Sequence, residues 1–268
     1  MTRALTVRLP GHTDDSPTQI RIAPLRGRDE KWLLGLPSET PRERVVTRIL
    51  SRRSGFGTRA VRDLPVGERN YLVLKLGQVT FGSRVEISLS CPRPHCGAPM
   101  HIDFDVDDLP VTRLRRRTDY PLSGAGGAHR SIRFRLPTGR DLEDAAIVGA
   151  DDPETALLAR CLVAGAPEAV DNPTVRAAVE TEMERVMPGV PQELETLCVD
   201  CGHEFDTEFD PVEWLLSRIR RGRAGLDRDI HLLSLHYHWP LDSILAMSGP
   251  RRREYVSLLE RQIGFATS

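Results

Sequence analysis

The chain has 268 residues, of which 40% are hydrophobic and 28% are charged, and its formal net charge is −1. Such a chain can bury a core without disulfides, and its near-neutral charge gives no overall attraction to nucleic acid or anionic lipid. Residues 1–10 lack the apolar stretch of a secretion signal, and no segment reaches the roughly 18 apolar residues of a membrane helix. We therefore expect a cytoplasmic protein whose cysteines are thiols or metal ligands.

The start of the chain predicts a β-hairpin followed by a helix. Apolar and polar side chains alternate at residues 4–10 and 18–25, as they do in strands, and a polar turn at residues 11–17 separates the two segments. Acidic side chains lie in the first turn of a helical segment at residues 27–36. This pattern is typical of an α+β fold.

Two more helices and a strand are predicted before the first cysteines. Residues 40–53 form an amphipathic helix, with Thr40 as its N-cap and Pro41 at the first helical position. Residues 64–82 form a helix that is apolar on most sides, so we expect it to be largely buried. Residues 84–90 alternate like a strand and lead into the first cysteine pair.

The middle of the chain predicts a loop, a strand and three helices. The glycine-rich loop covers residues 123–130, and the strand covers residues 131–136. Thr138 is the expected N-cap of the next helix, and Asp-Pro and Asn-Pro pairs open the other two. Cys161 lies on the apolar side of one of these helices, where we expect it to be a small buried side chain.

The C-terminal part of the chain predicts an appended helical module. We expect breaks between its helices at Gly222, Pro240 and Gly249. The module is rich in histidine, but on a helix His236 and His238 point about 200° apart and cannot share a metal ion.

Four of the five cysteines form two pairs that share one sequence pattern. When Cys96 is aligned with Cys201, the next nine residues match in pattern without a gap, and Gly97, Phe104 and Asp105 align with Gly202, Phe209 and Asp210. The glycine directly after each cysteine allows the positive φ that brings backbone N–H groups close to sulfur. Two turns with two thiolates each supply the four ligands of a tetrahedral zinc ion. We predict one structural Zn²⁺ held by Cys91, Cys96, Cys198 and Cys201.

Three other interpretations of the cysteines are weaker. A redox-active Cys-x-x-Cys lacks the surrounding βαβ pattern of thioredoxin-like proteins, and disulfides need an oxidising compartment. A catalytic zinc needs an open coordination position, which four thiolates do not leave. His95, His101 or His203 could replace a cysteine as ligand, but we expect them to hydrogen-bond near the site or to face solvent.

These elements predict an α+β protein built on a zinc ribbon. Each cysteine knuckle is followed by a strand, and the two halves meet at one metal ion. The segment between the halves then forms a mainly helical insertion whose ends lie close together. The expected regions are residues 1–105 with the N-terminal hairpin, helices and first knuckle, 106–195 with the insertion, 196–215 with the second knuckle and its strand, and 216–268 with the helical module.

The sequence contains no recognisable enzyme motif. Its glycine-rich stretches lack the Lys-Ser/Thr of a phosphate-binding loop, and no serine stands in a nucleophile elbow. Basic stretches at residues 218–223 and 249–255 leave open an alternative function as a zinc-ribbon nucleic-acid-binding protein. We nevertheless expect a protein without catalytic residues or a small-molecule substrate, which neither binds nucleic acid nor contacts a membrane.

Several stretches resemble a known family. They are LPVGERNYLVLKLGQVTFGSRVEISLSCPRPHCG, FRLPTGRDLEDAA and CVDCG with its alternating strand. The sequence from about residue 20 to 215 is similar to the baseplate hub assembly chaperones of T-even-like contractile phage tails and to their relatives in contractile injection systems. The tail at residues 229–263 resembles a small helical protein encoded near them.

This resemblance implies a non-enzymatic baseplate component or assembly factor, either retained in the particle or acting only during assembly. The expected partners are hub, spike or wedge proteins. Aromatic and arginine side chains are favoured anchors at interfaces. We therefore expect the helical module to dock through Trp239, Arg251, Arg252, Arg253 and Tyr255.

Overall fold

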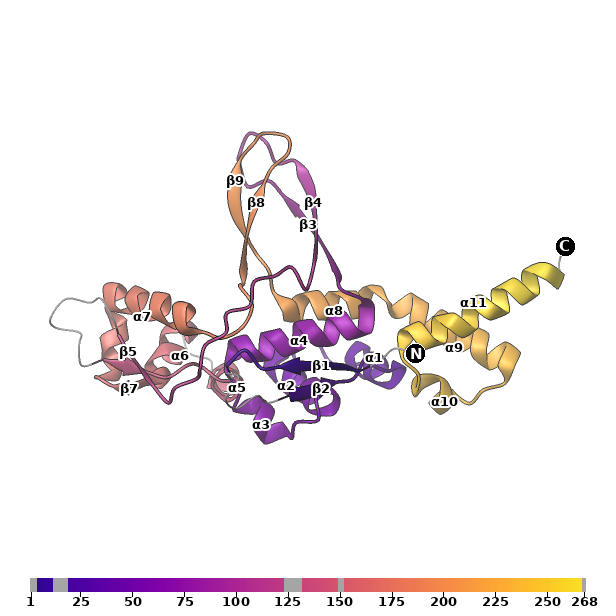
Figure 1. The fold of residues 1–268 in the computed structure, drawn as a ribbon, viewed down its shortest axis with the longest axis horizontal. Coiled ribbons are helices and arrows are strands. Elements are labelled where there is room, and N and C mark those ends of the chain that lie inside the picture. Colours follow the sequence, from indigo (N-terminus) through magenta and orange to yellow (C-terminus); the bar gives the residue numbers. More distant parts are fainter. Residues whose placement is uncertain (1–3, 12–18, 123–131, 149–151, 267–268) are drawn as a thin grey trace.

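The computed structural model describes residues 4–11, 19–122, 132–148 and 152–266, which form a mixed α+β fold. Figure 1 shows a central body from which three parts extend: a stalk of strands, a lobe from the middle of the chain, and a C-terminal group of helices. The predicted turn at residues 11–17 lies almost wholly outside the described residues, as does the predicted loop at residues 123–130.

The central body combines a small antiparallel sheet with four helices. Val7 lies opposite Ile20 in this sheet, and both belong to the main hydrophobic core. The elements are β1 (Leu5–Arg8), β2 (Gln19–Ile22), α1 (Gly27–Leu34), α2 (Arg42–Arg53), α3 (Thr58–Arg62) and α4 (Val66–Phe81). The sequence pattern predicted all of these except the short helix α3.

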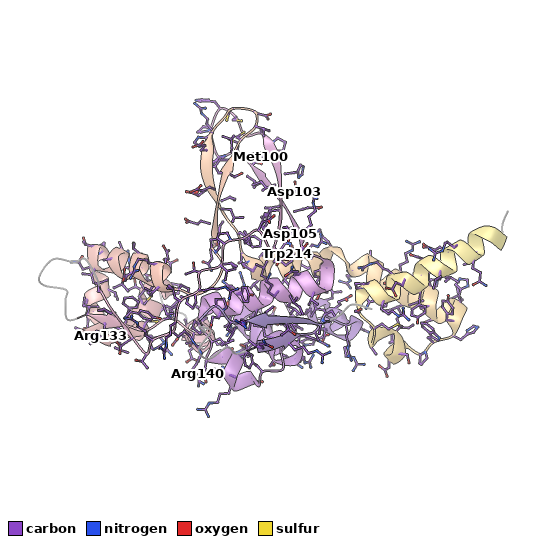
Figure 2. The ribbon with its side chains drawn as sticks, in the orientation of Figure 1. Met100, Asp103, Asp105, Arg133, Arg140 and Trp214 are labelled. Carbon is purple, nitrogen blue, oxygen red and sulfur yellow. The ribbon has the colours of Figure 1, made fainter. Side chains whose placement is uncertain are left out.

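Helix α4 is the centre of this body, and its apolar sequence on most sides explains its burial. Leu72, Val73 and Leu74 are each 0% exposed. Helix α8 (Pro211–Arg221) packs across α4, and its Trp214 lies at the base of the stalk (Figure 2). A Cβ atom at Gly77 of α4 would lie 2.0 Å from Cζ3 of Trp214, so the contact requires glycine at this position.

Helix α2 begins one residue later than the sequence predicted. Pro41 has φ −57° and ψ 120°, which is an extended conformation, and it is the N-cap of a helix whose first residue is Arg42. The predicted N-cap at Thr40 was therefore wrong. A proline is suited to the first helical position, but its ψ is not fixed by the ring, so the helix can start after it.

The lobe has a hydrophobic core of its own. Phe134, Cys161 and Val179 are each 0% exposed within it, so Cys161 is a buried side chain as predicted. Its three-stranded sheet has the antiparallel order β5-β6-β7, of which only β6 was predicted. The elements are β5 (Tyr120–Pro121), β6 (Arg133–Phe134), α5 (Gly139–Val148), α6 (Pro153–Cys161), β7 (Leu162–Ala164), the 3-10 helix η2 (Pro167–Asp171) and α7 (Pro173–Val186).

The contacts of Arg69 are among those that join the lobe to the body, and a backbone pair closes the base of the lobe. Arg69 of α4 is 1% exposed and its guanidinium lies 4.0 Å from the carboxylate of Glu143 of α5. A Cβ atom at Gly139 would lie 1.3 Å from Nη1 of Arg69, so glycine at the start of α5 leaves room for this buried cation. Thr112 and Gly189 exchange two backbone hydrogen bonds of 2.8 and 3.1 Å, which hold the two ends of the lobe segment together.

The C-terminal helices follow α8 and are α9 (Arg223–Tyr237), α10 (Leu241–Leu245) and α11 (Gly249–Ala266). The predicted breaks at Gly222 and Pro240 are confirmed, and Gly249 is the first residue of α11. The backbone N–H of Gly27 in α1 donates to the carbonyl of Met247 over 3.0 Å, which ties this group to the body. Within the described ranges, no helix is both long and apolar enough to cross a membrane.

Candidate metal centre

The two cysteine pairs lie in the turns of two separate β-hairpins that form the stalk. Strands β3 (Arg84–Ser90) and β4 (Pro99–Asp105) form the first hairpin, with Val85 opposite Phe104. Strands β8 (Glu193–Leu197) and β9 (Glu204–Glu208) form the second. Figure 1 shows both hairpins rising side by side from the body, so that their turns meet at the tip of the stalk.

The predicted strand after each knuckle is present, as β4 and β9. Each pairs with the strand before its knuckle in the same hairpin, so the two belong to different two-stranded sheets. Strand β8 was not predicted at all. Its five residues, ELETL, include two glutamates, a residue type that is depleted in strands, and exposed and half-buried positions alternate along it.

The two turns have the same local structure. Gly97 and Gly202, which follow the second cysteine of each pair, have φ of 58° and 66°, as the sequence pattern predicted. The N–H of Cys91 donates to the carbonyl of Ala98 over 2.9 Å, and the N–H of Cys198 donates to that of His203 over 2.9 Å. Each turn therefore points both of its sulfur atoms to the same side.

The four sulfur atoms form a compact cluster. All four lie within 4.8 Å of one another, and the Sγ atoms of Cys91 and Cys201, like those of Cys96 and Cys198, are 3.8 Å apart. A tetrahedron with Zn–S bonds of about 2.3 Å has S···S edges of about 3.8 Å, so the spacing fits a zinc ion. All five cysteines, each within a described range, are free thiols, because a disulfide needs sulfur atoms about 2.05 Å apart.

Backbone amides and burial shift the pKa values of these thiols in opposite directions. The backbone amide of His203 hydrogen-bonds to the sulfur of Cys201 and lowers its pKa to about 7. Burial raises the pKa of Cys91 to about 12, although a hydrogen bond from the backbone of Arg93 opposes it. A metal ion binds thiolates, so a cation at the centre of the cluster offsets the cost of ionising the buried thiols.

A small apolar shell surrounds the cluster. Met100 and Cys198 are 7% and 0% exposed, and Leu89 and Phe205 pack against them. Figure 2 shows Met100 near the tip of the stalk, with Asp103 and Asp105 further along β4 towards the body. Among the described residues, the only group arranged to hold a metal ion consists of these four cysteines.

The three histidines near the knuckles are not in that group. Nδ1 of His101 lies 3.1 Å from Oγ of Ser88 on the neighbouring strand. The ring of His203 stacks on that of Phe205, with centroids 5.8 Å apart. Among the described residues, His95 is not in the cluster that could hold a metal ion either.

The predicted docking residues occupy two different environments. Trp239 and Tyr255 meet edge to face with ring centroids 4.8 Å apart, and the guanidinium of Arg251 lies 4.4 Å from the centroid of Tyr255. Arg251 and Arg253 are exposed. Arg252 is 2% exposed, and its Nη2 and Nε atoms pair with Glu30 over 2.6 Å and with Asp229 over 3.3 Å.

Arg252 therefore does not belong to a docking surface, and this part of the prediction is corrected. The pattern of three consecutive arginines does not distinguish the one that faces inward. On helix α11 the middle arginine points to the acidic residues of α1 and α9, while its neighbours point to solvent. Its role is to hold the C-terminal helices on the body.

Comparison of the chain with known proteins identifies one matching family. No curated protein and no solved structure matches the chain. The model of the family described as "T4 bacteriophage base plate protein" matches residues 5–164, which is more than half of the chain. This stretch contains the body helices, the β3–β4 hairpin with Cys91 and Cys96, and most of the lobe. The chain therefore belongs to the T4 bacteriophage base plate protein family.

Proposed function

We propose that the protein is a non-enzymatic structural component or assembly factor of the baseplate of a contractile phage tail-like particle, with one structural zinc ion. The family match over residues 5–164 is the observation that carries this proposal. The sulfur cluster supports the zinc ion, because its S···S distances of 3.8 Å match a tetrahedral Zn²⁺ site.

The zinc ion would fix the stalk as a rigid projection. Cys91 and Cys96 come from one hairpin and Cys198 and Cys201 from the other, so a metal ion would clamp the two turns together. A two-stranded hairpin alone is marginally stable in water, so two hairpins joined at the tip make a firmer support than either one alone. The role of the ion would be structural, because four thiolates fill its coordination shell and leave no open position for a substrate.

The partners in this proposal are hub, spike or wedge proteins of the particle. The aromatic cluster of Tyr237, Trp239 and Tyr255, with Arg251 against it, supports docking by the C-terminal helices. Its members are half-buried rather than enclosed, apart from the exposed Arg251, so a partner can reach them. This surface is distinct from the stalk, which lies on another side of the body in Figure 1.

Complementation of particle assembly tests the proposal. Cells lacking the gene should form no complete contractile particles, and the wild-type gene should restore them. Trp239→Ala with Arg251→Ala should restore fewer particles and should weaken co-purification with baseplate proteins. Leu235→Ala, at an exposed residue of α9, is the matched control. Normal particles in the absence of the gene would overturn the proposal, and proteomics of purified particles would separate a retained component from an assembly factor.

A further inference from the structure

One face of the β8–β9 hairpin carries five exposed carboxylates. In the strand register Glu193 lies opposite Glu208, and Glu195 lies opposite Asp206. Glu204 continues the row towards the tip. No ion pair to any of the five occurs within the described ranges of the chain. Like charges directly opposite each other cost about 0.2–1 kcal/mol per pair, so this face is unfavourable in the isolated monomer.

A row of arginines on α2 is similarly exposed. Arg44, Arg48 and Arg52 follow one another at intervals of four residues and therefore lie along one face of the helix. The guanidiniums of Arg48 and Arg52 lie 4.5 and 5.2 Å from the ring centroid of Trp32 on α1. These contacts hold the two arginines extended across the surface without neutralising their charge.

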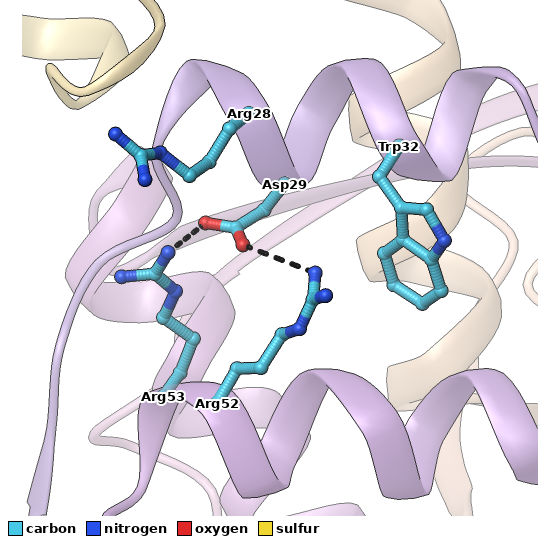
Figure 3. A pocket seen from close by; sticks show the side chains of 5 residues that line it. All are labelled: Arg28, Asp29, Trp32, Arg52 and Arg53. Carbon is cyan, nitrogen blue, oxygen red and sulfur yellow. Dashed lines mark ion pairs between the residues drawn. The ribbon is translucent and has the colours of Figure 1, made fainter.

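Two buried carboxylates beside this row, Asp29 and Glu143, are already paired with other arginines. Asp29 is 1% exposed and pairs with Arg53, while Arg52 lies at the longer distance of 4.0 Å (Figure 3). Within the described ranges, Arg44 and Arg48 form no ion pair. The face of α2 therefore presents at least two unneutralised guanidiniums beside a half-buried indole.

The spacing of the two charged rows matches. Residues four apart on a helix are separated by about 6 Å along its axis. Residues two apart on a strand are separated by about 6.7 Å. Arg44, Arg48 and Arg52 can thus lie against Glu208, Asp206 and Glu204 with one carboxylate for each guanidinium. Arginine and carboxylate groups form short charge-assisted hydrogen bonds in such a geometry.

No ion pair joins the two rows within one molecule in the described ranges, although Arg42 at the start of α2 pairs with Asp210 just after β9. Figure 1 shows the stalk projecting away from the body, and its acidic side chains are exposed. We propose that the acidic face of β8–β9 docks on the α2 arginine row of a second copy of this chain. The contact joins two different surfaces, so it is heterologous: in a chain of copies one acidic face stays free at one end and one arginine row stays free at the other. This inference concerns the purified chain and does not depend on the baseplate assignment.

Charge reversal on each surface tests the contact. Sedimentation of the full-length wild-type chain at low salt should show self-association that weakens as salt is added. The acid-face variant Glu195→Arg/Asp206→Arg and the arginine-row variant Arg44→Glu/Arg48→Glu should each associate roughly tenfold or more weakly. An equimolar mixture of the two variants should associate again, because each reversed surface faces an opposite charge on the other variant.

A control variant and a neutral variant complete the test. The control Glu154→Arg/Glu168→Arg reverses two exposed acids of the lobe, which changes the net charge as much as the acid-face variant does, and it should associate like the wild type. If a reversed variant fails to fold, the neutral variant Glu195→Gln/Asp206→Asn replaces it and should also weaken association. A wild-type chain that stays monomeric, or a mixture that does not associate, overturns the proposal. The proposal also fails if Arg44→Glu/Arg48→Glu abolishes salt-sensitive retention on duplex DNA while the wild type remains a monomer.

Discussion

Phe104 and Phe209, which occupy matching positions in the two cysteine-containing halves, meet edge to face with ring centroids 5.3 Å apart. This contact joins the two hairpins at the base of the stalk, as the sulfur cluster joins them at the tip. The two aspartates that follow have different roles. Asp105 accepts a hydrogen bond from Ser83, and Asp210 accepts from the backbone of Val212 at the start of α8. The two halves therefore correspond at the turns and at this aromatic contact, and they differ where the body begins.

Truncating Phe209 should destabilise the whole body. Its side chain is 2% exposed and belongs to the main hydrophobic core, so Phe209→Ala should lower the free energy of unfolding by about 3–5 kcal/mol. Urea unfolding followed by circular dichroism measures this value. Phe205→Ala, at a half-buried position near the tip, is the control and should cost clearly less. Equal losses in the free energy of unfolding in the two variants would show that the contact at the base of the stalk contributes no more to stability than the position near the tip.

Removing one cysteine of the cluster should remove the metal. We expect the wild-type chain to carry one zinc ion, and Cys198→Ser to carry almost none, because three thiolates and a hydroxyl bind Zn²⁺ far more weakly than four thiolates. Elemental analysis of the purified proteins gives the ratio directly. Cys161→Ala, which changes a buried thiol of the lobe core, should keep the zinc ion. A zinc-free wild-type chain would contradict the assignment.

The tip of the stalk could be predicted from the sequence because its determinants are local. Cysteine spacing and a glycine after each pair fix the turns, and Gly97 and Gly202 adopt the expected positive φ. The long apolar pattern of α4 likewise predicted its burial. What could not be predicted depends on distant contacts. Strand β8 has little local strand signal, and the burial of Arg252 is set by Glu30, which lies 222 residues away in the chain.

Adding a methyl group at Gly77 should be destabilising, and the effect should depend on Trp214. A Cβ atom at this position would lie 2.0 Å from Cζ3 of the indole, so Gly77→Ala must displace a buried ring. We expect a loss of about 1–3 kcal/mol in the free energy of unfolding. In a Trp214→Phe background, where the ring is smaller, the same substitution should cost less. A double-mutant cycle measures this coupling, and purely additive losses would argue against direct contact.

The lobe should lose stability in acid through Asp141. Burial acts to raise the pKa of Asp141, but hydrogen bonds from Arg135 and Thr138 outweigh it and bring the pKa to about 2. The unfolded value is about 3.9, so this stabilisation is fully present above about pH 4 and is lost as the pH falls towards 2.

Asp141→Asn should therefore lower the free energy of unfolding by about 2 kcal/mol at neutral pH, and by progressively less as the pH falls from about 4 to 2. Urea unfolding at a series of pH values measures both effects. Asp171→Asn, at an exposed residue, should leave the acid dependence of the wild type unchanged. An equal deficit at all pH values would contradict this account.

Replacing Arg252 should leave two buried acids without their counter-charge. Burial raises the pKa of both Glu30 and Asp229, and Arg252 opposes that rise. In Arg252→Met both pKa values should rise further. A carboxyl group with a raised folded-state pKa stabilises the fold below its unfolded pKa, and this contribution is lost as the pH rises through the folded value. The variant should thus lose about 3–5 kcal/mol of its free energy of unfolding at neutral pH and less near pH 4.

Urea unfolding at both pH values measures this difference. The control Arg253→Met, at the exposed neighbour, should change stability little. A loss in Arg252→Met that is the same at both pH values would refute the ion-pair explanation.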